Sequence, residues 1–451
     1  MAIVRSISGL RAQFGSGLTP NLISNYAYSL HKVIKSGKIV IGKDGRLGSE
    51  WIEKVLVGTF ESLGRDLEIL GTVPTPTVQF VTEKTDAVAG IVITASHNPQ
   101  DWCGLKFLDE NGVFLNQEMN EKLWKVLDSN EFNYPELKLG KTIYSYDVID
   151  KHIKSCLDLE IIKNSNVIVN ISKRNLKVVV DAVNASGSVI VPKLLEKLNY
   201  KVITINCDNS GIFPHTPEPI PANLTELANK VKIEKADFGV AVDPDADRLV
   251  LIDENGEPIG EEKTIVLAAK AVFEFYQNKE NLVATVNLST SNMIVELAKQ
   301  YGAKIEHSPV GEINVVEKMK VNGSIIGGEG SGGVIFPKAH YGRDSLVGIS
   351  LVSYILSNTN KTFSEICNEL PKFEMIKTKQ DFSGDFNQIK VKVTEIFKDD
   401  KLNFDDGIRI DLVEAWVQIR KSNTEPIIRI IAEAKTQELA QSLIDKIANI
   451  I

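Results

Sequence analysis

The sequence has few cysteines, and they lie far apart. The four are Cys103, Cys156, Cys207 and Cys367, and no two of them form a CxxC pair. Zinc sites and disulfide frameworks need paired or clustered cysteines, so neither is predicted for this chain. Reduced thiols in a cytoplasmic protein are the simplest interpretation.

Long apolar runs and an excess of positive charge are also missing. No stretch reaches the roughly 18 apolar residues of a membrane span, and the N-terminal segment, with Arg5 and several glycines, has no signal-peptide core. Asp plus Glu number 59 against 51 Lys plus Arg, which gives a formal net charge of −8. The sequence therefore predicts a cytoplasmic protein without a nucleic-acid or membrane partner, and an anionic substrate would need local clusters of cations.

Length and pattern predict several domains. The chain has 451 residues, and at about 150 residues per domain it would form three or four. Apolar runs that end in polar loops alternate with amphipathic stretches, which is typical of α/β units. From about Phe373 the pattern changes to strands followed by a C-terminal amphipathic helix. We predict three mixed α/β domains (1–145, 146–254, 255–370) and a smaller α+β C-terminal domain (371–451).

The segment DPDADR, residues 243–248, follows an apolar strand. Asp243, Asp245 and Asp247 alternate in a tight loop, where their carboxylates can converge on one point. Mg²⁺ prefers oxygen ligands and keeps positions open for water or phosphate. A solvated acidic turn is the alternative, but the adjoining strand and Arg248 favour metal binding.

A second polar loop ends the apolar run of IVITASHNP, residues 91–99. A serine hydroxyl is a weak nucleophile unless a base, a metal or phosphorylation changes its role. Ser96 has no GxSxG context, so an acyl-transfer triad is a poor fit. Taken alone, Ser96 and His97 are better explained as residues that cap a loop than as catalytic residues.

A third polar segment is RKSNTEPIIRI, residues 420–430. It places two guanidinium groups, two hydroxyls and an amide around a turn, a set suited to a phosphate dianion. The residues concerned are Arg420, Ser422, Asn423, Thr424 and Arg429. An ordinary β-turn is the alternative for this segment by itself.

TASHNP, DPDADR, GEGSGG and RKSNTEP, in this order, resemble the alpha-D-phosphohexomutase superfamily, with SISGLRA and PTPT in support. The resemblance covers essentially the whole chain. It implies four domains around a central cleft, and an isomerase that interconverts hexose 1-phosphates and 6-phosphates. The serine would be a phosphoserine, and a bisphosphorylated sugar would form in between and serve as activator.

The resemblance also implies roles for individual residues. Ser96 would transfer the phosphoryl group and, with the three aspartates, hold one Mg²⁺ ion. Four residues would surround the transferring group: His97, Lys106, Arg11 and Arg248. Glu329 and Ser331, from GEGSGG, would bind two sugar hydroxyls, and the 420–429 loop would hold the phosphate that is not reacting.

Three positions depart from the family's pattern. Gly333 stands where many members have His, so a proton-transfer role has no candidate there. Cys103 replaces an Asn that usually precedes the catalytic-loop Lys by three residues, and Ala12 replaces a Gly after Arg11. These differences bear on the substrate more than on the reaction class.

The segment RKSNTEP, residues 420–426, and the segment SPVGEINVVEKM, residues 308–319, resemble the phosphoglucosamine mutase type, which implies glucosamine phosphate as substrate. A phosphomannomutase/phosphoglucomutase is the alternative. A Mg²⁺-dependent sugar phosphatase is more distant, because hydrolysis does not require a grip on a second phosphate, and a non-catalytic sugar-phosphate sensor is more distant still. The sequence leaves open whether the protein is a monomer or a homodimer.

Overall fold

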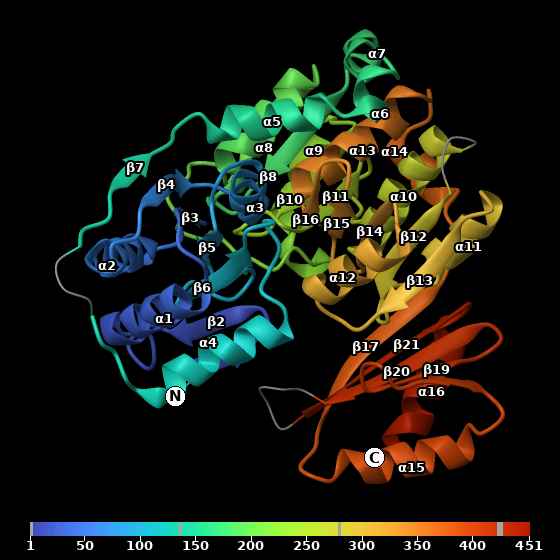
Figure 1. The fold of residues 1–451 in the computed structure, drawn as a ribbon. Coiled ribbons are helices and arrows are strands. Elements are labelled where there is room, and N and C mark those ends of the chain that lie inside the picture. Colours follow the sequence, from blue (N-terminus) through green and yellow to red (C-terminus); the bar gives the residue numbers. More distant parts are fainter. Residues whose placement is uncertain (1–2, 135–137, 278–280, 422–426) are drawn as a thin grey trace.

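In the computed structural model, which describes residues 3–134, 138–277, 281–421 and 427–451, the chain forms four sheets with their helices (Figure 1). The first three sheets mix parallel and antiparallel strands, and the fourth is antiparallel. The predicted fold class, three α/β domains with a smaller α+β domain at the C-terminus, is confirmed. The exact boundaries between the domains stay a prediction.

The first domain is built on a seven-stranded sheet with the order β1-β2-β6-β5-β3-β4-β7. Its parallel part comprises β5, β3, β4 and β7, and β6, β2 and β1 continue from β5 in antiparallel fashion. The strands are β1 (Ile3–Ser6), β2 (Gly9–Gln13), β3 (Ile39–Lys43), β4 (Leu67–Thr72), β5 (Ala89–Ile93), β6 (Trp102–Asp109) and β7 (Thr142–Tyr144). The helices are α1 (Pro20–Val33), α2 (Ser49–Ser62), α3 (Thr75–Lys84) and α4 (Gln117–Ser129).

The second domain has a four-stranded sheet with the order β11-β10-β8-β9. Its strands are β8 (Lys177–Asp181), β9 (Lys201–Ile205), β10 (Phe238–Val242) and β11 (Leu249–Asp253). Its helices are α5 (Val148–Leu157), α6 (Glu160–Lys163), α7 (Val167–Arg174), α8 (Gly187–Lys197), the 3-10 helix η1 (Pro221–Asn223) and α9 (Thr225–Glu234). All residues of β10 and β11 are buried, which is why the sequence from 238 to 253 consists of two apolar runs with a polar loop between them.

The third domain has a five-stranded sheet with the order β13-β12-β14-β15-β16. Its strands are β12 (Val283–Asn287), β13 (Lys304–Ser308), β14 (Ile326–Glu329), β15 (Gly333–Phe336) and β16 (His340–Arg343). Its helices are α10 (Glu262–Tyr276), α11 (Met293–Gln300), α12 (Glu312–Asn322), α13 (Ser345–Ser357) and α14 (Phe363–Asn368). Every residue of α13 is buried, and one continuous apolar core joins this domain to the second.

The fourth domain has its own apolar core and lies to one side of the other three (Figure 1). Its sheet has the order β17-β21-β20-β19-β18. The strands are β17 (Glu374–Asp381), β18 (Lys401–Asn403), β19 (Ile408–Asp411), β20 (Ala415–Lys421) and β21 (Ile427–Ala434), and the helices are α15 (Phe386–Ile396) and α16 (Gln437–Ala448). No helix within the described part of the chain has both the length and the apolar character needed to cross a membrane.

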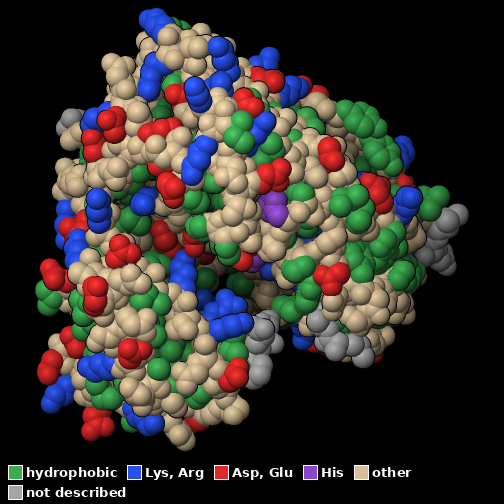
Figure 2. All heavy atoms as spheres, turned by 180° about the vertical axis from the view of Figure 1, so that it is seen from behind, with side chains coloured by type: hydrophobic (Ala, Val, Ile, Leu, Met, Phe, Trp, Pro, Cys, Tyr) green, Lys and Arg blue, Asp and Glu red, His purple; other side chains and the backbone are tan. Residues whose placement is uncertain are grey.

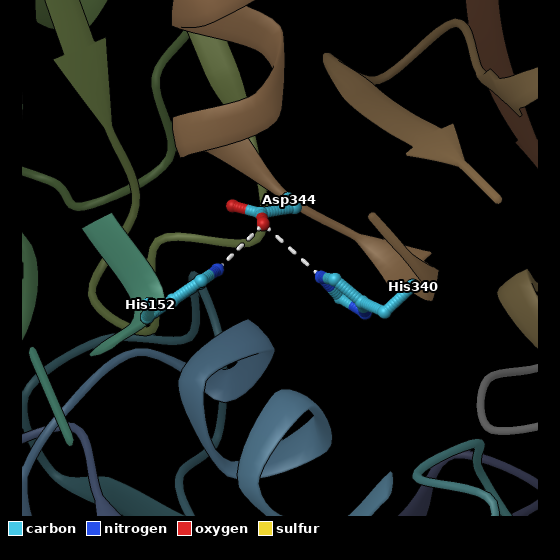
Figure 3. Close-up of side chains that lie close together, drawn as sticks. All are labelled: His152, His340 and Asp344. Atoms are coloured by element: carbon cyan, nitrogen blue, oxygen red, sulfur yellow. Dashed lines mark hydrogen bonds and ion pairs between the residues drawn. The ribbon is translucent and has the colours of Figure 1, made fainter. Parts of the chain in front are cut away.

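A buried hydrogen-bonded cluster ties the first three domains together (Figure 3). Nε2 of His152, from α5, and Nε2 of His340, from β16, lie 2.9 and 3.0 Å from Oδ2 of Asp344. The other ring nitrogen of His152 lies 2.9 Å from the hydroxyl of Thr77 on α3. Oδ1 of Asp344 accepts from the backbone of Leu346 and so caps α13. Burial opposes ionisation of Asp344, but the imidazoles outweigh it and lower the pKa of this carboxyl.

We expect Asp344→Ala to destabilise the chain by about 3–5 kcal/mol, because it removes a helix cap and leaves buried imidazole N–H groups without their acceptor. Asp385→Ala is the matched control, since Asp385 caps the exposed helix α15 in the same way but contacts no histidine. The control should cost about 0.5–2 kcal/mol. Chemical denaturation measures both, and equal losses would mean that the histidine contacts contribute nothing.

Candidate active site

Ser96 sits in the loop that follows the buried strand β5. Its backbone adopts a left-handed conformation with φ +50°, which is strained for a residue with a side chain. The hydroxyl lies 3.0 Å from Oδ2 of Asp243 and 3.3 Å from Nδ1 of His97. Ser96 is 1% exposed. The structure therefore brings together the serine loop of the first domain and the aspartate loop of the second, although 147 residues separate Ser96 from Asp243.

Two buried residues that sequence reasoning missed support this loop. Asp44 accepts from the Thr94 hydroxyl at 2.6 Å and pairs with the Arg46 side chain at 2.8 Å. Arg46 in turn donates to the carbonyls of Ser96 and Trp102. The signal was present in KDGR, residues 43–46, where three charged residues directly follow an apolar run that lies in the buried strand β3. A buried Asp–Arg pair of this kind fixes the backbone that carries the serine.

The aspartate loop joins β10 to β11, and its three carboxylates are completely buried. Asp245 Oδ2 accepts from the Thr75 hydroxyl at 2.6 Å and from Lys106 Nζ at 2.6 Å. Asp247 Oδ2 accepts from Lys106 at 3.1 Å and from Arg343 at 2.6 Å. In both residues the other oxygen, Oδ1, is buried without a hydrogen-bond partner. In Asp245 and Asp247, one carboxylate oxygen thus accepts two hydrogen bonds and the other accepts none.

The pKa values of Asp243 and Asp247 shift in opposite directions. Burial, with Asp247 and Asp245 as neighbours, raises the pKa of Asp243 well above its usual range. Burial also opposes ionisation of Asp247, but the charges of Arg343 and Lys106 outweigh it and lower the pKa of that carboxyl. The negative charge of the loop therefore lies beside Arg343 and Lys106. A further cation near Asp243 would lower the raised pKa of that carboxyl.

The remaining residues predicted around the serine also lie at this point. Arg11 donates to the Asn98 side chain at 2.9 Å, and burial lowers the pKa of Arg11. Nε of Arg248 lies 4.0 Å from carboxylate oxygens of Asp243 and Asp247. Burial and the nearby Arg248 and Arg11 charges lower the pKa of His97 well below 6.5, so its imidazole is neutral near pH 7.

The sugar-recognition loop predicted from GEGSGG runs from β14 to β15. Oε1 of Glu329 accepts from the Asn287 side chain at 2.7 Å and from the backbone of Gly311 at 3.0 Å. Oε2 accepts from Arg343 at 2.6 Å. Ser331 lies at the wall of the same cleft as Glu329. Glu329 is thus held by three donors and faces the cleft with a fixed orientation.

Arg420 and Arg429 lie directly opposite each other on the antiparallel strands β20 and β21, and both line the cleft. Directly paired like charges on adjacent strands repel, so this arrangement favours an anion beside them. Asp406 is 2.9 Å from Arg420 and offsets part of the charge. Ser422, Asn423 and Thr424, predicted to join this group, lie outside the described residues.

Side chains from all four domains line one cleft of about 500 Å³, among them His97 of the serine loop, Arg248 of the aspartate loop, and Glu329. Figure 2 shows the hollow from behind, with Lys and Arg side chains beside it. Within the described part of the chain, its lining includes seven cations and four glutamates. The cations are Arg11, Lys106, Arg248, Arg343, Lys377, Arg420 and Arg429. A chain with net charge −8 therefore gathers positive charge where an anionic substrate would enter.

Two clusters of described residues have the spacing of metal ligands: the aspartate loop, and His152 with His340 and Asp344. In the histidine cluster both Nε2 atoms that face Asp344 already lie at hydrogen-bond distance from it. In the aspartate loop two buried oxygens have no partner. Carboxylate oxygens are also the ligands that Mg²⁺ prefers. The aspartate loop therefore fits a hard divalent cation.

Comparison with known proteins gives the same order of domains. Models of phosphoglucomutase/phosphomannomutase alpha/beta/alpha domains I, II and III match residues 4–134, 155–256 and 261–373, and the model of the C-terminal domain matches residues 386–450. A phosphoglucomutase/phosphomannomutase of Thermococcus kodakarensis is 37% identical over 445 residues, which cover 97% of this chain and 96% of that protein. The chain belongs to the phosphoglucomutase/phosphomannomutase family.

Other members are similar over the same length. A probable phosphoglucosamine mutase of Methanosphaera stadtmanae is 35% identical over 454 residues, with 98% of this chain and 96% of that protein covered. The crystal structure of a family protein from Burkholderia thailandensis superposes with a TM-score of 0.83 at 23% identity, covering 99% of this chain and 97% of that one, and so shares the fold. Family membership confirms the predicted enzyme class, an isomerase of the phosphohexomutase type.

Glu262, at the start of α10, is a titratable group of the cleft wall that sequence reasoning missed. Its carboxylate accepts from the backbone of Ser291 at 3.0 Å and from Lys377, on β17 of the fourth domain, at 2.9 Å. Burial raises the pKa of Glu262 to about 7, against the opposing charge of Lys377.

This shift predicts a pH-dependent contribution to stability. Between pH 4.5, the ordinary pKa, and about 7 the folded chain keeps a proton that the unfolded chain has lost. The contribution of Glu262 therefore falls as pH rises, by up to about 1.4 kcal/mol per pH unit. The Tm of wild type relative to Glu262→Gln should decrease across this window and stay constant outside it. Glu131→Gln, at an exposed position, should give a flat difference, and a flat difference for Glu262→Gln as well would contradict the shift.

Proposed function

We propose that this protein interconverts hexose 1-phosphates and 6-phosphates through a phosphoserine at Ser96 and a bisphosphorylated sugar intermediate. The observation that carries the proposal is that one cleft is lined by His97 of the serine loop, by Arg248 of the aspartate loop and, on a separate domain, by the arginine pair of β20 and β21, while Ser96 itself lies 3.0 Å from Asp243. A sugar with a phosphate at each end would engage both. The substrate partner is a small sugar phosphate, and a sugar bisphosphate would act as activator.

Transfer starts from the phosphorylated form of Ser96. The bond between the serine oxygen and phosphorus breaks and a bond from phosphorus to a sugar hydroxyl oxygen forms, while the sugar hydroxyl gives up its proton and the departing serine oxygen takes one up, so that Ser96 ends as a free hydroxyl. The sugar, now carrying two phosphates, reverses its orientation in the cleft. The phosphoryl group that it carried from the start is then transferred to Ser96. Lys106, Arg11 and Arg248 would offset the charge on the transferring group, and His97, neutral near pH 7, lies within reach of the serine oxygen.

Asp243, Asp245 and Asp247, with an oxygen of phosphorylated Ser96, would hold Mg²⁺. When bound, the ion supplies positive charge that stabilises the phosphoryl group during transfer. The two unpartnered Oδ1 atoms support this assignment, because Lys106, Thr75 and Arg343 occupy the opposite edges of those carboxylates.

Glu329 and Ser331 would bind two ring hydroxyls. The carboxylate of Glu329 would accept a hydrogen bond, and the hydroxyl of Ser331 could donate or accept one. Arg420 and Arg429, with Ser422, Asn423 and Thr424, would hold the phosphate that is not reacting. This distal grip favours a mutase over a sugar phosphatase, because hydrolysis of one phosphate does not depend on holding a second. The cytoplasmic location stays a prediction.

Glucosamine 6-phosphate and glucosamine 1-phosphate are the substrates we favour, in keeping with the RKSNTEP segment, with the 308–319 segment and with several relatives named probable phosphoglucosamine mutase. The relative that is 37% identical is named phosphoglucomutase/phosphomannomutase, which favours glucose and mannose phosphates as second candidates. An assay with purified protein and all three sugar phosphates, with a catalytic amount of bisphosphate, ranks them.

Ser96→Ala should abolish most turnover in this assay while the fold survives, because the hydroxyl that carries the phosphoryl group is gone. Intact-mass analysis of wild type should show a fraction heavier by one phosphoryl group that maps to Ser96. Ser62→Ala, which removes a hydroxyl bonded within α2, is the matched control and should keep full activity. An active Ser96→Ala protein would disprove the nucleophile, and release of free phosphate in place of isomerised sugar would point to a phosphatase.

Arg420→Ala should weaken binding of the sugar phosphate about ten- to a hundredfold, since it removes a charge-assisted contact worth about 1.5–3 kcal/mol. Turnover should fall with affinity, because remote binding energy also orients the reacting hydroxyl. Arg5→Ala, which loses a surface pair with Asp128, should change neither. Steady-state kinetics measure both variants, and unchanged kinetics for Arg420→Ala would place the phosphate grip elsewhere.

A further inference from the structure

Gly333, the position where the family's histidine is missing, has a structural partner in this chain. A Cβ atom at Gly333 would lie 2.2 Å from Cδ, 3.0 Å from Cγ and 3.3 Å from Nε of Arg343. The backbone of Gly333 has no left-handed φ, so its conformation alone does not require glycine. What the glycine provides is the room through which the stem of Arg343 passes on its way to the cleft.

Arg343 ends β16 and contacts three buried carboxylates from different parts of the chain. Its Nε donates to Glu312 at 3.0 Å, one terminal nitrogen to Glu329 at 2.6 Å, and the other to Asp247 at 2.6 Å. Its own backbone N–H also donates to Glu312. The residue is 8% exposed and its side chain forms part of the cleft wall. Each of the three guanidinium nitrogens therefore donates one hydrogen bond, which engages three of its five N–H donors.

Two of these contacts fix groups that the proposed reaction uses, and the third fixes Arg343 itself. Glu329 accepts from three described donors, out of about four acceptor positions that a carboxylate offers. One direction is left for a sugar hydroxyl. Asp247 has one oxygen taken by Arg343 and Lys106 and the other free. Glu312, held also by Gln79 at 3.0 Å, anchors the guanidinium from behind.

We propose that Arg343 is a positioning residue that holds the sugar-binding carboxylate of Glu329 and the aspartate loop in one fixed arrangement, and that Gly333 is glycine in order to admit it. This inference rests on the proposed function of the cleft. A guanidinium stays protonated and donates only, so Arg343 does not replace an imidazole in proton transfer. Arg343 instead occupies the space that a side chain at position 333 would need. A group that can titrate is thereby exchanged for a guanidinium of constant charge, which joins the second and third domains.

A double-mutant cycle on Gly333 and Arg343 tests the proposal. The variants Gly333→Ala, Arg343→Ala and the double variant are made in wild type and in the Ser96→Ala background, where the serine cannot react. Titration calorimetry with glucose 6-phosphate and glucosamine 6-phosphate measures affinity in that background, and steady-state kinetics measure KM and kcat in the other. Arg343→Lys keeps the charge without the fork and serves if Arg343→Ala does not fold. Gly58→Ala, with open space around its Cβ, is the matched glycine control.

Arg343→Ala should weaken binding about ten- to a hundredfold, the size expected for lost charge-assisted contacts. Gly333→Ala should do so about tenfold when Arg343 is present and less than about twofold when it is not, because contacting residues couple and the methyl group then meets no arginine. Arg343→Lys should recover only part of the loss, and Gly58→Ala should bind normally. Thermal unfolding verifies that each variant is folded.

Three results would overturn the proposal. They are normal affinity in a folded Arg343→Ala or Arg343→Lys protein, a Gly333→Ala effect that persists without Arg343, and normal affinity in Gly333→Ala. If wild type isomerises none of the sugar phosphates but binds them, and the cycle shows the expected coupling, the proposed function fails and the role of Arg343 stands. If neither these two sugar phosphates nor mannose 6-phosphate binds, the proposed function and the role of Arg343 are overturned together.

Discussion

The structure depends on keeping three buried carboxylates next to one another. Asp243, Asp245 and Asp247 lie together without exposure to solvent, an arrangement that mutual repulsion and desolvation would forbid in an apolar interior. Lys106, from the first domain, and Arg343, from the third, supply the opposing charge across the domain borders. The aspartate loop, contributed by the second domain, is thus stable only where three domains meet, and the candidate active site is also the point at which their buried charges pair.

The sequence allowed the fold class to be predicted, because buried strands that end in polar residues are short-range patterns, visible around Ser96, Asp243 and Glu329. These strands belong to three different sheets, so the grouping of their loops followed from the resemblance to a family and not from the pattern. The three strands and the helix of residues 408–448 were visible from their short-range patterns.

Arg343, which sequence reasoning also missed, has no such local signal. Arg343 sits in HYGRDS, which resembles a surface turn, and only the tertiary fold places it opposite Gly333 and between Glu329 and Asp247. Asp44 and Arg46 stabilise a loop some 50 residues away. Their contacts depend on which strands become neighbours, and the chain order alone does not determine the order β6-β5-β3. Departures from a family's pattern could be seen in the sequence, but what compensates for them could not.

The separate core of the fourth domain has a consequence for how the molecule unfolds. The second and third domains share one apolar core, whereas the fourth meets the third through polar contacts such as Ser289 with Gln418 and Asn292 with Glu433. Cooperative melting requires apolar surface that is lost by both partners at once. The fourth domain should therefore melt as its own calorimetric unit. A ligand that spans the cleft would merge the two heat-absorption peaks, because neither unit could then unfold without releasing it.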